Sequence, residues 1–334
     1  MALIASAVRF TVKIVFVFAV LCMPIMLKAA FYPGWLTPVE SGDGGSTLTL
    51  NPSTSEKEYK TMMRQLRYAV ENYPSSKYRA WYIMQLANGL YELNELDAAL
   101  SWFKVLEMLP EATAFAAIPN FSSVADAKIE AWFGQARCVA QQGEAGKAVA
   151  ALNNILPRND ADRVLIAELQ LLLNRRTTAA RFLGETAGAG MKDPALRLRA
   201  GMIYRVLLQQ REAEALFKSV ADDASAHDSL RGQAAEMIKL SRFRTPNSFV
   251  DGNYTGAASS GGGTLELVVT IKRGEVSRIV PDGHRGVNAV GYEAAVRRLV
   301  RSGVPVIDAV TGYESICTAA CVAVSGALQK ARRD

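Results

Sequence analysis

The sequence contains few of the residues that build metal centres, disulfide scaffolds or disordered chains. Its 334 residues include two histidines and four scattered cysteines, which argues against a Cys/His zinc module and against a small fold held by disulfides. Proline accounts for 12 residues and apolar side chains for 50% of the chain, so the composition is not that of a collagen-like or wholly disordered protein. We also find no constellation of residues typical of a hydrolase or a transferase.

A block of like charge is missing as well. The chain has 38 Lys and Arg against 32 Asp and Glu, and the net charge of +6 is divided as +1, +3 and +2 among residues 1–54, 55–244 and 245–334. A nucleic-acid-binding protein concentrates its Lys and Arg on one face or stripe. The distribution therefore predicts no nucleic-acid partner.

One long apolar run is present at residues 14–27, and Arg9 and Lys13 precede it. Its fourteen residues fit the apolar region of a secretory signal, whereas a membrane-spanning helix needs about 20. Counted from Phe10, the segment could just span a membrane. We expect residues 1–30 to be a signal-anchor or a cleaved signal peptide, with a buried core helix as the remaining alternative.

Basic residues ahead of such a segment keep the N-terminus in the cytoplasm. The expected location is the inner membrane, with a single span and the body of the protein on the extracytoplasmic (periplasmic) side. If the segment is cleaved, the protein is instead periplasmic or secreted. Residues 31–57 are rich in Gly, Ser, Thr and Pro and are expected to form a flexible linker.

Residues 58–243 show helical periodicity and internal similarity. Equivalent small residues recur 49, 31 and 34 residues apart, at Ala87, Ala136, Ala167 and Gly201. This pattern resembles the tetratricopeptide repeat, a helix–turn–helix unit of about 34 residues. The resemblance implies an all-α solenoid whose surface docks a protein or peptide partner. An ordinary α-helical bundle is the alternative.

The pattern changes after residue 248. Leu265, Leu267, Val269 and Ile271 alternate with other residues and predict a strand with one buried face. A turn at residues 272–275, a second strand at 276–280, an amphipathic helix at 290–302 and a small-residue helix ending near residue 331 follow. Residues 304–312 are expected to be extended, and the arginines of the first helix to face solvent (Arg297, Arg298 and Arg301).

Two motifs bracket this part of the chain. Residues 251–256 read Asp-Gly-Asn-Tyr-Thr-Gly, and residues 307–314 read Ile-Asp-Ala-Val-Thr-Gly-Tyr-Glu. Both resemble the motifs that open and close the FMN-binding domain of sodium-pumping quinone reductase and Rnf-type electron-transport subunits. The resemblance covers residues 249–331 and implies a small α+β flavin domain.

The resemblance also implies a set of FMN-binding residues. Glu314 stands where covalently flavinylated relatives carry the Thr that forms the phosphoester, so we expect noncovalent FMN. Backbone N–H groups at the start of the last helix would receive the phosphate. The expected cofactor-binding residues are Gly261, Gly262, Gly263, His284, Thr311, Gly312, Tyr313, Ser315 and Thr318.

Two functions follow as hypotheses. The first is a membrane-tethered extracytoplasmic flavoprotein that transfers electrons, with a membrane redox complex as an expected partner, and without a catalytic acid or base and without a metal. The second is an interaction scaffold in which the FMN-binding-like domain is degenerate or only structural. Cys317 and Cys321, four residues apart on the last helix, are expected to be small core residues rather than a disulfide.

Overall fold

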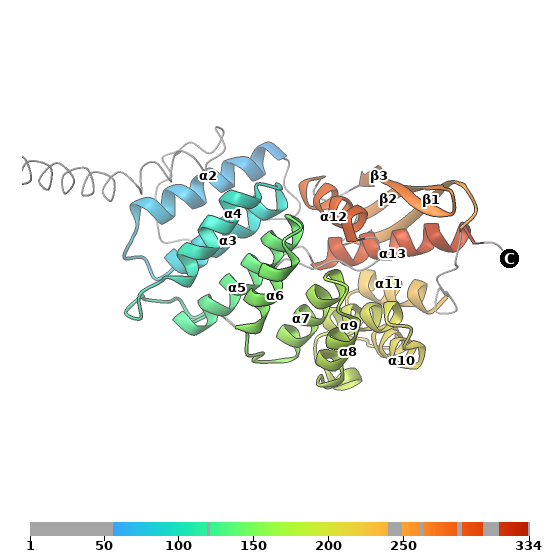
Figure 1. The fold of residues 1–334 in the computed structure, drawn as a ribbon, viewed down its shortest axis with the longest axis horizontal. Coiled ribbons are helices and arrows are strands. Elements are labelled where there is room, and N and C mark those ends of the chain that lie inside the picture. Colours follow the sequence, from blue (N-terminus) through green and yellow to red (C-terminus); the bar gives the residue numbers. More distant parts are fainter. Residues whose placement is uncertain are drawn as a thin grey trace, which may run out of the picture.

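The computed structural model describes residues 56–118, 121–239, 249–260, 263–285, 289–302 and 314–332. It is mostly helical and contains one small three-stranded antiparallel sheet. Figure 1 shows the helices α2 to α11 following one another, with the sheet and the last two helices on one side of them. The prediction of a mainly helical chain that ends in a small α+β part is confirmed at this level.

The helical array, α2 to α11, consists mainly of consecutive antiparallel helix pairs. The array opens with α2 (Glu56–Asn72) and ends with α11 (Asp228–Lys239), and a short 3-10 turn, η1 (Gly188–Gly190), precedes α9. The four pairs between them are α3 (Arg79–Glu92) with α4 (Leu96–Glu107), α5 (Val124–Gln141) with α6 (Ala145–Asn153), α7 (Asp160–Leu172) with α8 (Arg176–Gly184), and α9 (Pro194–Val206) with α10 (Gln210–Ala221).

The equivalent small residues found in the sequence lie inside these helix pairs. Gly201 shows why size matters there, since an added Cβ would lie 2.6 Å from the ring of Phe217 on the partner helix. A side chain at this position would force the two helices apart. The aligned small positions are all buried, in the first helices (Ala87, Ala136, Ala167, Gly201) and in the second (Ala99, Ala148, Ala179, Ala213).

The same turn joins the two helices of every pair. Each connection has three residues, and its middle residue has a left-handed backbone, with φ values of 63°, 84°, 59° and 64° at Asn94, Gly143, Asn174 and Leu208. Asn and Gly tolerate this conformation, but a branched apolar residue does so only with strain. Leu208 is therefore the one strained position among the four turns.

Replacing Leu208 with glycine is expected to raise the free energy of unfolding by about 1 kcal/mol, because the left-handed strain is removed. The side chain is 65% exposed, so its loss removes little packing. Urea denaturation of the full chain measures the change. Leu156 is 82% exposed and has no positive φ, so Leu156→Gly should not stabilise; a gain there as large as at Leu208 would contradict the strain argument.

The terminal unit, residues 249–332 as described, begins with the sheet. Its strands β1 (Gly252–Ser260), β2 (Gly263–Lys272) and β3 (Glu275–Arg285) pair antiparallel in the order β1-β2-β3. The predicted alternation is confirmed, because the four alternating apolar positions named above are buried (Leu265, Leu267, Val269 and Ile271). Strand β1 was not predicted, because its segment is built from Gly, Ala, Ser, Asn, Thr and Tyr.

Two helices complete the terminal unit. They are α12 (Ala289–Ser302) and α13 (Glu314–Lys330). Helix α13 packs on β1 and β2 and also contacts α9 and α11 of the array, so it has protein on both sides. This position explains why residues 316–325 are all buried and why small side chains dominate them.

The predicted signal segment, residues 1–30, lies outside the described residues, as do most of the predicted linker and the extended segment 304–312. Helix α2 begins at Glu56, two residues before the predicted start of the repeats. Among the helices of the described part, none combines the length and the apolarity needed to cross a membrane.

Candidate functional site

The predicted FMN residues that the structure describes gather at one end of the terminal unit. Helix α13 runs antiparallel to β1: the N–H of Val250 donates to the carbonyl of Ala331 (2.8 Å), and Lys330 Nζ donates to the carbonyl of Thr255 (2.8 Å). The C-terminal end of α13 thus lies beside the start of β1. Its first turn must lie toward the opposite end, where β1 turns into β2.

Element lengths support this placement. Gly256 faces Ala323 and Ala327 of α13, and Ser260 lies about 13 Å further along β1 at about 3.3 Å per residue. About nine residues of helix cover the same distance. Residues 314–318 therefore lie level with the end of β1.

The backbone register places further predicted residues at this end. Gly263 pairs with Ser260, and His284 in β3 pairs with Leu265 in β2. Ser315 and Thr318 lie in the first two turns of α13, and Thr318 is 5% exposed. The remaining predicted residues lie outside the described part of the chain (Gly261, Gly262, Thr311, Gly312 and Tyr313).

The start of α13 favours an anion at this end of the unit, whereas the charge of Glu314 opposes one. The start of a 17-residue helix presents N–H groups without helical partners and the positive end of the helix dipole. The hydroxyl residues Ser315 and Thr318 belong to the same two turns. Glu314, the first residue of α13, opposes an anion by its own negative charge.

The opening motif has structural contacts of its own. The carboxylate of Asp251 accepts hydrogen bonds from the N–H groups of Arg273 (3.0 Å) and Gly274 (2.9 Å), which closes the β2–β3 turn. The hydroxyl of Tyr254 donates to the carbonyl of Val250 (3.1 Å). Gly256 lets α13 approach β1, since an added Cβ would lie 1.9 Å from the carbonyl oxygen of Ala323. The motif therefore helps to build the unit itself.

Tyr292 ties α12 to the sheet. It is fully buried, and its hydroxyl donates to the carbonyl of Glu266 in β2. Burial, with the nearby charges of Asp282 and Glu266, raises the pKa of this hydroxyl. Tyr292 accordingly stays protonated and acts as a structural donor.

The terminal unit docks on the inner row of the array. The first helices of successive pairs contact one another, from α3 to α5, α7 and α9, and we call them the inner row. Helix α12 packs against α3, and α13 packs against α9, while α11 contacts both β1 and α13. The terminal unit thus reaches both the early and the late part of the array (Figure 1).

A buried ion pair lies at the centre of this docking. Arg298 Nη1 in α12 lies 2.9 Å and 3.0 Å from the two carboxylate oxygens of Glu92 at the end of α3. The two side chains are 5% and 0% exposed. Arg298 Nη2 also donates to Cys317 Sγ (3.1 Å), and the guanidinium lies 5.4 Å from the centre of the Tyr91 ring. Arg297 Nη2 donates to the backbone carbonyl of Glu92 (2.7 Å).

The prediction that Arg298 faces solvent is therefore wrong, and Arg297 is half-buried at the same contact. The side chain of Arg301 lies outside the described part of the chain. The partner of Arg298 lies 206 residues earlier in the chain, and no periodicity within α12 can reveal a contact of that kind. Cys317 and Cys321 are buried and form no disulfide among the described residues, in agreement with their expected role as small core residues.

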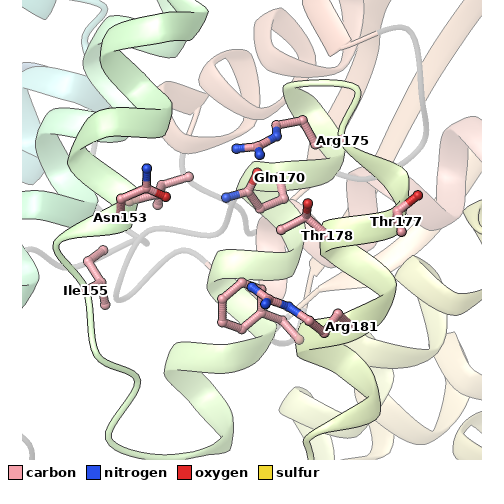
Figure 2. Close-up of a pocket in the computed structure, with 9 residues that line it drawn as sticks. Asn153, Ile155, Gln170, Arg175, Thr177, Thr178 and Arg181 are labelled. Atoms are coloured by element: carbon pink, nitrogen blue, oxygen red, sulfur yellow. The ribbon is translucent and has the colours of Figure 1, made fainter.

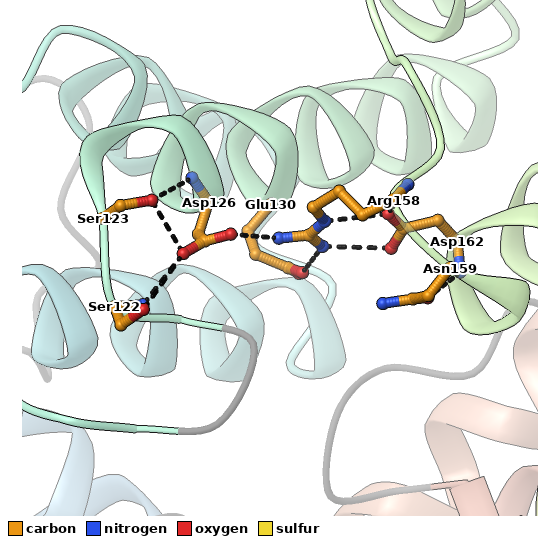
Figure 3. A network of polar contacts seen from close by, with 7 residues as sticks. All are labelled: Ser122, Ser123, Asp126, Glu130, Arg158, Asn159 and Asp162. Atoms are coloured by element: carbon orange, nitrogen blue, oxygen red, sulfur yellow. Dashed lines mark hydrogen bonds and ion pairs between the residues drawn. The ribbon is translucent and has the colours of Figure 1, made fainter.

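A second polar cluster links two helix pairs of the array (Figure 3). Arg158 binds Asp126 (2.9 Å) and Glu130 (3.1 Å) of α5 and Asp162 (2.8 Å) of α7. Burial alone lowers the pKa of the Arg158 guanidinium, but these carboxylates outweigh it and raise that pKa. Burial likewise raises the pKa of Glu130, against the opposing charges of Arg137 and Arg158. We interpret the cluster as a structural link between α5 and α7.

The described residues contain no group of three or more His, Cys, Asp or Glu that could hold a metal ion. Comparison of the chain with protein-family models, with curated proteins and with solved structures found no match.

Proposed function

We propose that the chain is a membrane-tethered extracytoplasmic flavoprotein that binds FMN noncovalently and transfers electrons. In this proposal the array is a tetratricopeptide-like solenoid that docks a protein partner, and the terminal unit is the FMN-binding domain. The observation that carries the proposal is the gathering of Gly263, His284 and the start of α13 at one end of the unit. Residues far apart in the sequence thereby lie at the same end of the unit.

The residues present fit FMN held without a covalent bond. The first turns of α13, with Ser315 and Thr318, would hold the phosphate. Glu314 has no hydroxyl and cannot form a phosphoester, and its charge favours a position for the phosphate away from its own carboxylate. The bound cofactor would supply the one- and two-electron chemistry, while the chain supplies binding, orientation and exclusion of water.

The form of the array supports the solenoid part of the proposal. Four helix pairs repeat the same three-residue turn, and the terminal unit covers part of the inner row. Stacked repeats of this kind present extended surfaces to proteins. The partner would accordingly use the faces of the array that the terminal unit leaves open.

A specific observation favours the scaffold as a second candidate. Asp251, Tyr254 and Gly256 of the opening motif all make contacts within the unit, so the motif can persist without a flavin. In this case the terminal unit serves as a structural brace for the array through Glu92 and Arg298.

A visible absorption spectrum of the purified full chain, before and after acid precipitation, separates the candidates, because bound flavin would make the protein yellow. We expect yellow protein whose colour moves to the supernatant. Colour retained in the pellet would contradict noncovalent binding, and a colourless protein from a flavin-sufficient host would favour the scaffold.

A matched pair of variants locates the cofactor. Ser315→Ala combined with Thr318→Val is expected to lower FMN retention about tenfold, because two hydroxyl donors to a charged phosphate are removed. Ser325→Ala is the control on the same helix, since the Ser325 hydroxyl donates to the carbonyl of Cys321 (2.8 Å) and lies in the second half of α13. Equal retention in both variants would place the phosphate elsewhere.

A further inference from the structure

A cavity of about 510 Å³ lies in the helical array, between the end of α6 and the pair α7–α8 (Figure 2). Its volume is in the range of pockets that bind small organic molecules, about 300 to 1,000 Å³. Ile155 and Phe182 are among the residues that line it and provide apolar surface. It belongs to the array and is separate from the end of the terminal unit described above.

The cavity is positively charged. Arg175 and Arg181 line it, and the residues that line it include no acidic side chain. Several other arginines of the array pair with carboxylates, as Arg199 does with Glu168 (2.6 Å), whereas Arg175 and Arg181 form no ion pair with the residues that the structure describes. The guanidinium of Arg181 lies 4.8 Å from the ring centre of Phe182. Two guanidinium groups thus remain available at the rim for an anion.

A buried acceptor at the cavity lacks a partner. Gln170 on α7 is 2% exposed, and its side-chain oxygen Oε1 is buried without a hydrogen bond. Figure 2 shows the carboxamide pointing into the space between Asn153 and Thr178. An unsatisfied buried acceptor costs about 1 to 3 kcal/mol and is rare in native proteins. A ligand that donates an N–H or O–H group would remove this cost.

We infer that the cavity binds an organic anion of the acylated acidic amino-acid type, with carboxylates, an N–H donor and an apolar group. Arg175 and Arg181, which lie toward opposite ends of the cavity in Figure 2, bind the carboxylates. Gln170 Oε1 accepts the N–H, and the apolar group packs against Ile155 and Phe182. A free acylated acidic amino acid and an acidic segment of another protein share this chemistry. This site is independent of FMN binding in the terminal unit.

Fluorescence titration of the full chain with dansyl-L-glutamate tests the site, since this probe has carboxylates, a sulfonamide N–H and an apolar ring system. We expect saturable binding, and at least about tenfold weaker binding of dansylamide, which lacks the carboxylates. The double variant Arg175→Gln, Arg181→Gln should bind dansyl-L-glutamate at least about tenfold more weakly. Arg211→Gln, an exposed arginine on α10, is the control and should leave binding unchanged.

The variant Gln170→Met tests whether Gln170 contacts the ligand or only supports the fold. This change removes the unsatisfied acceptor and keeps the volume of the side chain. It is expected to raise the melting temperature of the free chain and to weaken binding of the probe severalfold. Binding of the probe that is unchanged in the double arginine variant, or equal for dansylamide, would overturn the proposal. Unchanged binding by Gln170→Met would overturn the role of Gln170.

Competition identifies the source of the ligand. Stronger displacement of the probe by N-acetyl-L-glutamate than by the capped peptide acetyl-Ala-Glu-Leu-amide would assign the cavity to a free small molecule. The reverse order would assign it to an acidic segment of a protein. Failure of both to displace the probe would overturn the proposed ligand class.

Discussion

Replacing Arg298 with alanine is expected to lower the free energy of unfolding of the chain by about 3 to 5 kcal/mol, the usual cost of breaking a buried ion pair by removing one partner. The carboxylate of Glu92 is 0% exposed and would lose its paired charge. The contact with the Tyr91 ring and the hydrogen bond to Cys317 Sγ would be lost with it. Urea denaturation measures the stability, and hydrogen exchange of the α12 amides measures the docking.

The double variant Glu92→Leu, Arg298→Met is the control for this prediction. Apolar residues of similar volume leave no unpaired charge, so it should recover most of the stability lost in the single variants. Arg211→Gln on α10, where the arginine is exposed, should change stability by less than about 0.5 kcal/mol. A loss below about 1 kcal/mol for Arg298→Ala would mean that apolar contacts, rather than this pair, hold the terminal unit on α3.

Hydrogen exchange adds a result specific to docking. Helix α12 contacts β3, α13 and α3, and only the last of these belongs to the array. If the ion pair fixes the terminal unit to α3, Arg298→Ala should accelerate exchange in α12 and in the last turn of α3. Exchange in α5 and α6 should stay unchanged.

The helix pairs of the array could be predicted because their determinants are local. The small residues Ala87, Ala136, Ala167 and Gly201 recur at intervals that one helix pair can fill, and the structure places all four inside pairs. The turns add a second local signal, the Asn or Gly at three of the four left-handed positions. The fourth left-handed position is Leu208, and a leucine gives no signal of a turn in the sequence.

The terminal sheet could be predicted only in part. Strand β2 alternates apolar and other residues, whereas the strand character of β1 comes from its pairing with β2 and from the helix α13 that covers it. Tertiary contacts override weak local propensity in such a segment. Glu92 and Arg298 were missed for a similar reason, because two charges 206 residues apart become a buried pair only after both units have folded.

The candidate sites also depend on tertiary contacts more than on local signals in the sequence. The convergence of Gly263, His284 and Ser315 depends on strand register and helix direction, and a resemblance between motifs was needed to suggest it from the sequence. The cavity beside Gln170 had no sequence signal at all, since Arg175, Arg181 and Phe182 are ordinary residues of a helix pair. Their arrangement follows from the packing of two consecutive repeats.

Replacing Gly256 with alanine is expected to destabilise the chain by about 3 kcal/mol, the upper end of the usual cost of overpacking, because the backbone it meets cannot rotate away. The new Cβ would lie 1.9 Å from the carbonyl oxygen and 2.7 Å from the carbonyl carbon of Ala323, and 3.2 Å from Ala327 Cβ. Helix α13 would have to move away from β1. Urea denaturation and near-ultraviolet circular dichroism of the full chain measure the loss.

Gly326→Ala is the matched control, because Gly326 lies on α13 itself and an added Cβ there meets nothing within 4 Å. Alanine is a better helix former than glycine by about 1 kcal/mol, so this variant should be neutral or stabilising. A loss of stability for Gly256→Ala together with no loss or a gain for Gly326→Ala would show that Gly256 is required for close packing of α13 on β1. Equal changes in stability for the two variants would instead indicate that α13 can shift along β1. In that case close packing would not explain why the opening motif has a glycine at position 256, and contact with a ligand would be the remaining explanation.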